Sequence, residues 1–490
     1  MAEPGSGGRA RDPNPDLPEP SGVPNVLASR YAGAPLRALW SPEGRVVMER
    51  RLWVAILEAQ IDLGLVVPEG VVGAYRDAIH DVDLASIRAR EEVTRHDLKA
   101  RIDEFCGLAG HEYIHRGLTS RDVTENVEQM LIRRSLEILR DKTVAVLARM
   151  AAVAAEHRDT VIVGRTHNVP AQCTTLGKRF ADAAQETLVA YRRVEHLISD
   201  LPLRGLKGAV GTQQDLLDLF DGEGDKVDGL ERLVADGLGF GSTLTAVGQI
   251  YPRSLDLDLV SALVQLSAGP SSMATTLRLM AGNDLVTEGF GVGQVGSSAM
   301  PHKRNMRTCE RIGGLAVVMG GYLAMASSLS GRQWNEGDVS DSVVRRVMIP
   351  DSLFACDGLL ESTLHVLDGF SAFPGRIEAE LAAELPFLST TRMLVAVLKE
   401  GMGRERAHRL IRRHPLAAAD ALRAGGECDL WSALGDDPGF PLTTDRVREV
   451  ATSGYLAGRS ASQVDTIVEQ VAQVTETFAE AAAYEPETLL

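Results

Sequence analysis

Apolar and polar positions along the chain follow the spacing of helices almost throughout. Residues 119–163 contain neither glycine nor proline, and their apolar positions recur at steps of three and four residues, as on one face of a helix. A helix of ~30–40 residues, at ~1.5 Å per residue, would be ~45–60 Å long. That length exceeds an ordinary globular helix and indicates a long helical bundle.

Caps and further apolar blocks mark other helices. Ser41, Pro42 and Glu43 combine a capping hydroxyl, a first-turn proline and an early acid, which predicts a helix that runs to about Leu63. No alternating apolar and polar pattern lasts long enough to predict a sheet. The chain is therefore predicted to be all-α. Further helices are expected at about 175–199, 253–282, 308–330 and 343–367.

One uncharged stretch, 312–331, has the length of a membrane span. Glycines at 313, 314, 320 and 321, together with several serines, dilute its apolar character. We therefore expect a helix buried in a bundle or in a subunit interface, and no membrane association.

Composition narrows the class of protein. The net charge of −16 over 490 residues argues against a protein that coats nucleic acid. The five cysteines are widely spaced and lack metal-ligand spacing, which is typical of reduced thiols in a cytoplasmic protein and predicts no structural metal. The first 23 residues are rich in glycine, proline and serine and contain no apolar run, so we expect a disordered leader and no secretory signal.

Changes in pattern suggest the domain boundaries. The long uninterrupted helix starts near Gly117, and glycines at 369 and 375 flank a second joint. We expect a leader (1–23), an N-terminal helical domain (24–117), a central helical bundle (118–369) and a C-terminal helical domain (370–490).

The most informative segment for chemistry runs from 296 to 305 and reads GSSAMPHKRN. Pro301 fixes its own backbone and pushes Met300 out of the helical region, so this is a loop. Hydroxyls, backbone N–H groups and the cations Lys303 and Arg304 suit a substrate with carboxylates. A proton beside a carboxylate can be removed only if the charge that develops is stabilised. Taken alone, the loop leaves open the less favoured alternative of a solvated basic turn before a helix.

Two side chains are candidates for proton transfer. Ser297 is a poor base by itself, but Lys303 and a set of N–H groups could stabilise its alkoxide. His167, in a predicted loop before Pro170, could deliver a proton near neutral pH. An isolated histidine is more often structural, and His111, His115 and His302 are assigned to structure or loops.

Three segments resemble the active-site signatures of the fumarase/aspartase superfamily, whose members release fumarate or a close analogue by β-elimination. They are SSAMPHKRN (297–305), TSRDVTEN (119–126) and GRTHNVPAQ (164–172). Further segments are similar to the adenylosuccinate lyase family within it. These are SRY (29–31), TRHD (94–97), KGAVGTQ (207–213) and SDSVVRR (340–346).

The resemblance implies roles for individual residues. It also implies a reaction that needs neither metal nor cofactor. It implies Ser297 as base and His167 as acid, with His96, Lys303 and Glu310 completing the catalytic set. The implied substrate contacts are Thr119, Ser120, Gln213 and Asn305 at the succinyl group, Arg30, Tyr31, Ser342 and Arg346 at the phosphate with Arg311 nearby, Asp97 at the ribose or purine, and also Arg95, Thr166, Ser298 and Met300.

The family also implies an architecture and a reaction. The fold would be three-domain and fumarase/aspartase-like, with a central bundle that assembles into a homotetramer whose sites are shared between subunits. The substrates would be succinyl-purine nucleotides: adenylosuccinate, giving AMP, and the succinyl-aminoimidazole carboxamide ribotide (SAICAR), giving its amide (AICAR).

One departure stands out. Many family members carry arginine after the Trp-x-Glu that precedes the 340–346 segment, whereas Glu336 here is followed by Gly337 and Asp338. A sister lyase, acting on argininosuccinate or on a specialised-metabolite succinyl adduct, would keep Ser297 and His167 without needing a phosphate site. A non-catalytic scaffold is the remaining alternative, and the intact catalytic set argues against it.

Overall fold

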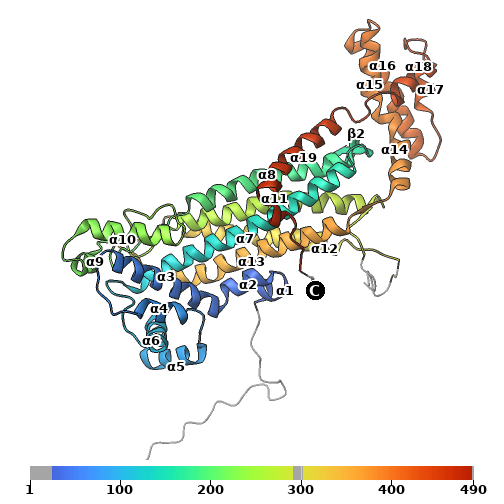
Figure 1. Ribbon diagram of the computed structural model, residues 1–490. Helices are drawn as coiled ribbons and strands as arrows, with labels where there is room; N and C mark the ends of the chain where they lie inside the picture. Colours follow the sequence, from blue (N-terminus) through green and yellow to red (C-terminus); the bar gives the residue numbers. More distant parts are fainter. Residues whose placement is uncertain (1–24, 291–299, 301, 488–490) are drawn as a thin grey trace, which may run out of the picture.

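The computed structural model describes residues 25–290, 300 and 302–487 as an elongated bundle of long helices (Figure 1). The predicted leader, Ser297 and Ser298 lie outside the described residues. Five long helices form the body: α7 (Ser120–Glu156), α8 (Leu176–Asp200), α11 (Ser254–Ala281), α12 (Arg307–Leu329) and α13 (Ser342–Gly369). Their bounds confirm the predicted helices to within a few residues, and the 37 residues of α7 confirm the predicted long helix.

Shorter helices gather at one end of the bundle and along its side (Figure 1). Helix α3 starts at Pro42 behind Ser41, whose hydroxyl accepts the N–H of Gly44 at 2.9 Å, and this confirms the predicted cap. The other bounds are α1 (Val26–Arg30), α2 (Ala34–Trp40), α3 (Pro42–Asp62), α4 (Val71–Asp77), α5 (Leu84–Thr94), α6 (Asp97–Ala109), α9 (Gln214–Leu219) and α10 (Gly224–Gly237).

A small β-hairpin follows α7, where the sequence predicted a loop and no sheet. Strands β1 (Val161–Thr166) and β2 (Val169–Thr175) pair antiparallel. His167 and Asn168 form the two-residue turn, with left-handed φ values of 54° and 61°, which suits the twist of a tight hairpin. The strands are short and do not alternate cleanly between apolar and polar residues, so the pattern did not reveal them. Strands β3 (Val286–Thr287) and β4 (Ser371–Ala372) form a second short pair.

The C-terminal part separates into two regions. Helices α14 (Pro374–Leu388), α15 (Thr390–Lys399), α16 (Arg404–Arg423), α17 (Leu430–Gly435) and α18 (Thr444–Thr452) project from the bundle (Figure 1). Helices α15 to α18 pack around a separate hydrophobic core, which contains Met393, Val397, Leu434 and Val447. Helix α19 (Ser460–Thr477) then returns to pack on α7 and α8, followed by α20 (Ala479–Ala482).

The burial of helix α12 differs from the prediction of a helix buried in the bundle. Within the described chain it packs on α11 and α13 but is not fully buried, since Val317 is 77% exposed. This helix and the segment Pro374–Lys399 are long and apolar enough to cross a membrane by composition alone, which is weak support for a span.

Candidate active site

A polar cavity of about 640 Å³ lies where three helices begin. Helices α6, α7 and α13 each contribute their first turns, where the positive end of the helix dipole favours an anion. Five of the predicted site residues meet in its lining, namely His96, Asp97, Ser120, Ser342 and Arg346.

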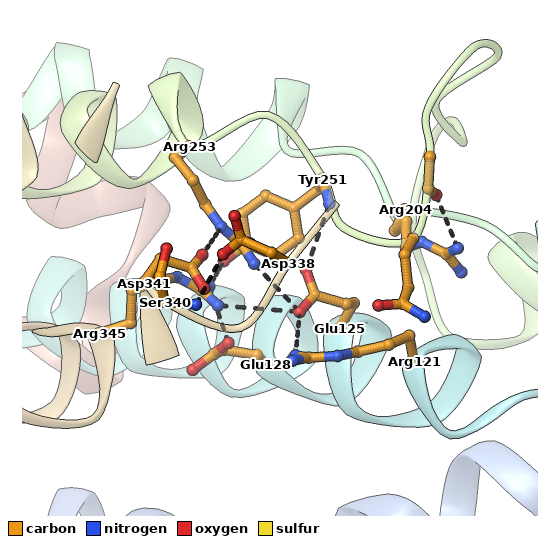
Figure 2. A network of polar contacts seen from close by, with 12 residues as sticks. Arg121, Glu125, Glu128, Arg204, Tyr251, Arg253, Asp338, Ser340, Asp341 and Arg345 are labelled. Atoms are coloured by element: carbon orange, nitrogen blue, oxygen red, sulfur yellow. Dashed lines mark hydrogen bonds and ion pairs between the residues drawn. The ribbon is translucent and has the colours of Figure 1, made fainter. Parts of the chain in front are cut away.

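A buried network of charges (Figure 2) includes four residues that line this cavity, namely Arg121, Glu125, Glu128 and Arg345. Glu125 of α7, 1% exposed, accepts from both terminal nitrogens of Arg253, at 2.8 and 3.2 Å, and from Arg121 at 2.9 Å. Burial works against ionisation of Glu125, but Arg253 and Arg345 outweigh it and lower the pKa of this carboxyl.

Arg345 joins three helices through the same network. Its guanidinium pairs with Glu128 of α7 and with Asp256 of α11, at 2.7 Å in both cases. Arg253 also pairs with Asp341, directly before α13. These contacts hold the start of α13, and with it Ser342 and Arg346, against α7. No role could be predicted for these residues from the sequence, although Arg121, Glu125, Asp341 and Arg345 lie inside the family motifs.

His96 and Asp97 lie at the start of α6. The Nδ1 atom of His96 accepts the N–H of Lys99 at 3.3 Å, which places the ring proton of the neutral form on Nε2. Asp97 pairs with Arg101 at 3.0 Å. Arg101 and a backbone N–H outweigh partial burial and lower the pKa of Asp97. Arg95, directly before them, takes a left-handed φ of 54° as the C-cap of α5.

Asp122 connects the start of α7 to the KGAVGTQ segment. One carboxylate oxygen accepts from the guanidinium of Arg204 at 2.6 Å and from the N–H groups of Lys207 and Gly208 at 2.8 and 3.0 Å. The other accepts the N–H of Thr119 at 2.8 Å. Gln213, at the end of that segment, donates to the carbonyl of Leu206 at 3.0 Å. The predicted succinyl-binding positions Thr119 and Gln213 are therefore tied to one buried carboxylate.

The described part of the signature loop borders a second cavity, of about 850 Å³. His302, Lys303, Asn305 and Glu310 line it, and Glu310 lies 3.7 Å from Arg278 of α11. Glu288, which the sequence did not single out, accepts the N–H groups of Thr308 and Cys309 at 2.9 Å each. It fixes the start of α12 directly after the loop. Met300 is 44% exposed.

Arg30 and Tyr31 end helix α1, beside α12 and α13. The guanidinium of Arg311 in α12 lies 5.5 Å from the centre of the Tyr31 ring, within range of a cation–π contact. Burial lowers the pKa of Arg311. The predicted phosphate residue Tyr31 and the neighbouring Arg311 are thus in contact, while Arg30 is exposed.

His167 and Thr166 lie exposed at the tip of the hairpin. Ser120 begins α7 and the hairpin follows the other end of that helix, so ~55 Å of helix separates them. The described residues of one chain therefore do not bring His167 together with the cavity that contains His96 and Ser120. Across the residues that the structure describes, no group of three or more His, Cys, Asp or Glu side chains could hold a metal ion.

Family models and similar proteins both identify this chain as related to lyases. The family model described as lyase matches residues 55–321, and the one described as adenylosuccinate lyase C-terminus matches residues 386–467. The adenylosuccinate lyase of Saccharomyces cerevisiae is 35% identical, covering 93% of this chain and 95% of the yeast protein. That of Schistosoma mansoni is 33% identical, with 91% and 94% covered. That of Pyrococcus abyssi is 31% identical, with 91% and 97% covered.

Solved structures agree on the fold. The 3-carboxy-cis,cis-muconate lactonizing enzyme of Pseudomonas putida superposes with a TM-score of 0.77 at 20% identity, covering 92% of this chain and 99% of that one. A fumarate lyase from a Mesorhizobium species gives 0.76 at 20% identity, with 90% and 98% covered. The all-α, fumarase-like fold predicted from the sequence is confirmed. The chain belongs to the adenylosuccinate lyase family of the fumarase/aspartase superfamily.

Proposed function

We propose that this enzyme cleaves adenylosuccinate to AMP and fumarate, and SAICAR to AICAR and fumarate. A base removes the proton from the carbon next to one carboxylate, the C–N bond breaks, and the electron pair stays on the nitrogen, which an acid protonates. The observation that carries the proposal is the cavity in which the starts of α6, α7 and α13 converge with Arg346. Such a set of helix starts and a guanidinium suits a substrate that carries phosphate and carboxylates.

The catalytic roles follow the family motifs. Ser297 serves as base and His167 as acid, while Lys303 and Asn305 bind the carboxylates. Glu310 and His96 support the proton transfers, Thr119, Ser120 and Gln213 hold the succinyl group, and Thr166 is a further substrate contact. Ser298, Met300, Arg95 and Asp97 complete the contacts to substrate.

The phosphate is assigned to Arg30, Tyr31, Ser342 and Arg346, with Arg311 behind Tyr31. Gly337 takes a φ of 127°, a backbone conformation that an arginine rarely adopts. The basic contact that many relatives supply at this position is therefore absent, and the remaining arginines must hold the phosphate. This departure is the observation that favours the sister lyase as the second candidate.

The active unit is proposed to be a homotetramer with D2 symmetry and shared sites, located in the cytoplasm. Two observations support shared sites. The segment 119–126 lies at the opposite end of α7 from the hairpin of residues 164–172, and α12 exposes apolar side chains, including Val317 at 77%, Val318 at 38% and Met325 at 41%. Burying such a face against a copy of itself satisfies its composition without a membrane.

One spectroscopic experiment tests the proposed reaction. The absorbance change is followed after adding adenylosuccinate, and in parallel after adding argininosuccinate, under identical conditions. Turnover of adenylosuccinate and not of argininosuccinate is expected. Cleavage of argininosuccinate alone would establish the sister-lyase activity instead.

A further inference from the structure

A lysine is buried in the middle of the bundle with two carboxylates. Lys142 of α7 is 2% exposed, and its ammonium lies 2.5 Å from Asp357 and 2.7 Å from Glu361, both in α13. The two acids are 0% and 1% exposed. One positive charge among two negative ones leaves a net charge of −1 in the interior, which needs further hydrogen-bond donors to be tolerated.

The first of these donors comes from the segment that follows α1. The second oxygen of Asp357 accepts the N–H of Gly33 at 2.6 Å. A Cβ atom at Gly33 would lie 2.7 Å from the ammonium of Lys142, so the backbone passes directly over the charge. At the next residue of α13, a Cβ atom at Gly358 would lie 2.6 Å from the Cβ of Tyr31. The backbone of residues 31–33 is therefore held closely against α13.

The other donors come from the far end of the chain. Glu361 accepts the hydroxyl of Tyr484 at 2.6 Å and the N–H of Glu487 at 3.0 Å. The side chain of Glu487 then accepts the N–H of Ala34 at 2.6 Å and lies 3.7 Å from Arg37. Its carbonyl is 2.7 Å from His365. Residues 484–487 thus connect α13 to the start of α2 and enclose the buried triad from outside.

The contacts from Asp357 and from Glu487 both end on backbone N–H groups within four residues of Arg30. Asp357 holds the N–H of residue 33, and Glu487 holds the N–H of residue 34. The short helix α1, five residues long, has little stability of its own. The path of the chain after Tyr31 is accordingly set by tertiary contacts with α13 and the 484–487 segment.

We propose that Glu487 and Tyr484, acting through the buried Lys142–Asp357–Glu361 triad, position Arg30 and Tyr31 for the phosphate of the substrate. They are positioning residues and need not touch the nucleotide. The inference rests on the proposed function, since it takes Arg30 and Tyr31 as phosphate ligands. It assigns a role in substrate affinity to a segment more than 450 residues away from them in sequence.

Three substitutions near the C-terminus test this role, because they leave the buried lysine intact. Glu487→Ala removes the acceptor for Ala34, whereas Glu487→Gln keeps an oxygen at that position. Glu485→Ala is the matched control, since the Glu485 side chain is 84% exposed and lies 3.6 Å from Arg149. Each variant is assayed with adenylosuccinate and with the corresponding nucleoside that lacks the phosphate, and AMP binding is measured by calorimetry.

For Glu487→Ala we expect KM for adenylosuccinate and Kd for AMP to rise about five- to tenfold, with kcat within about twofold of wild type. The kcat/KM for the phosphate-free nucleoside should not change. Glu487→Gln should recover most of the affinity, and Glu485→Ala should match wild type.

Two results would overturn this inference while leaving the proposed function intact. One is unchanged KM and Kd in Glu487→Ala beside an active wild type. The other is an equal loss on both substrates, which would indicate a merely structural contact. A wild-type protein that neither cleaves adenylosuccinate nor binds AMP would overturn the inference together with the proposed function.

Discussion

Substitution of two adjacent arginines at the start of α13 should affect different properties: KM for Arg346 and stability for Arg345. Arg346 is exposed and lines the 640 Å³ cavity. Arg345 is 4% exposed and pairs with Glu128 and Asp256. If Arg346 binds the phosphate, Arg346→Ala removes a charge-assisted pair that contributes about 1.5–3 kcal/mol. At about 1.4 kcal/mol per tenfold change, KM for adenylosuccinate should rise roughly 10- to 150-fold while kcat changes little.

Arg345→Ala should act on stability instead. It leaves Glu128 and Asp256 without their strongest partner in a buried network, and removing one member of a buried pair typically costs about 3–5 kcal/mol. Thermal unfolding and steady-state kinetics are measured on both variants. The reasoning would be refuted if Arg346→Ala kept the wild-type KM, or if Arg345→Ala unfolded at the wild-type temperature.

Two further predictions concern the base and a buried acid. Ser297→Ala should keep the fold by circular dichroism but lower kcat by at least ~10³, because an essential proton transfer is lost; near-normal turnover would exclude Ser297 as the base. Burial, only partly offset by Arg101 at 2.8 Å, raises the pKa of Glu49 to about 7. Folding then takes up a proton between the unfolded pKa of 4.5 and about pH 7, so this group lowers stability progressively across that window and fully above it. Glu49→Gln should therefore raise the unfolding temperature relative to wild type more at pH 8 than at pH 5, and an equal difference at both values would contradict the assignment.

The helices could be predicted because the sequence encodes them locally. Residues 119–163 lack helix breakers, and Ser41 with Pro42 forms a cap that involves only neighbours. The hairpin could not be predicted, since its short strands have no clean alternation and its turn depends on two left-handed residues, His167 and Asn168, that are not glycine.

Candidate site residues could be named from the sequence, but their arrangement in space could not be predicted. Motifs identified Ser120, Ser342 and Arg346, and the structure places them around one cavity. The contacts that hold the candidate residues join positions far apart in the chain. Arg253 and Glu125, beside the cavity, are 128 positions apart, and Lys142 and Asp357, beside residues 31–34, are 215 apart. Periodicity and capping carry no information about such pairs, because they depend on how whole helices pack.

The central claim is that one active site combines Ser297 and His167 from different chains. Ser297→Ala and His167→Ala proteins, each inactive alone, are mixed in equal amounts under conditions that exchange subunits, with exchange verified by mass spectrometry. Each site then has an even chance of receiving an intact serine and, independently, an intact histidine, so about a quarter of wild-type activity should return. Verified exchange with no recovered activity would mean that both residues serve a site from the same chain, which contradicts the account.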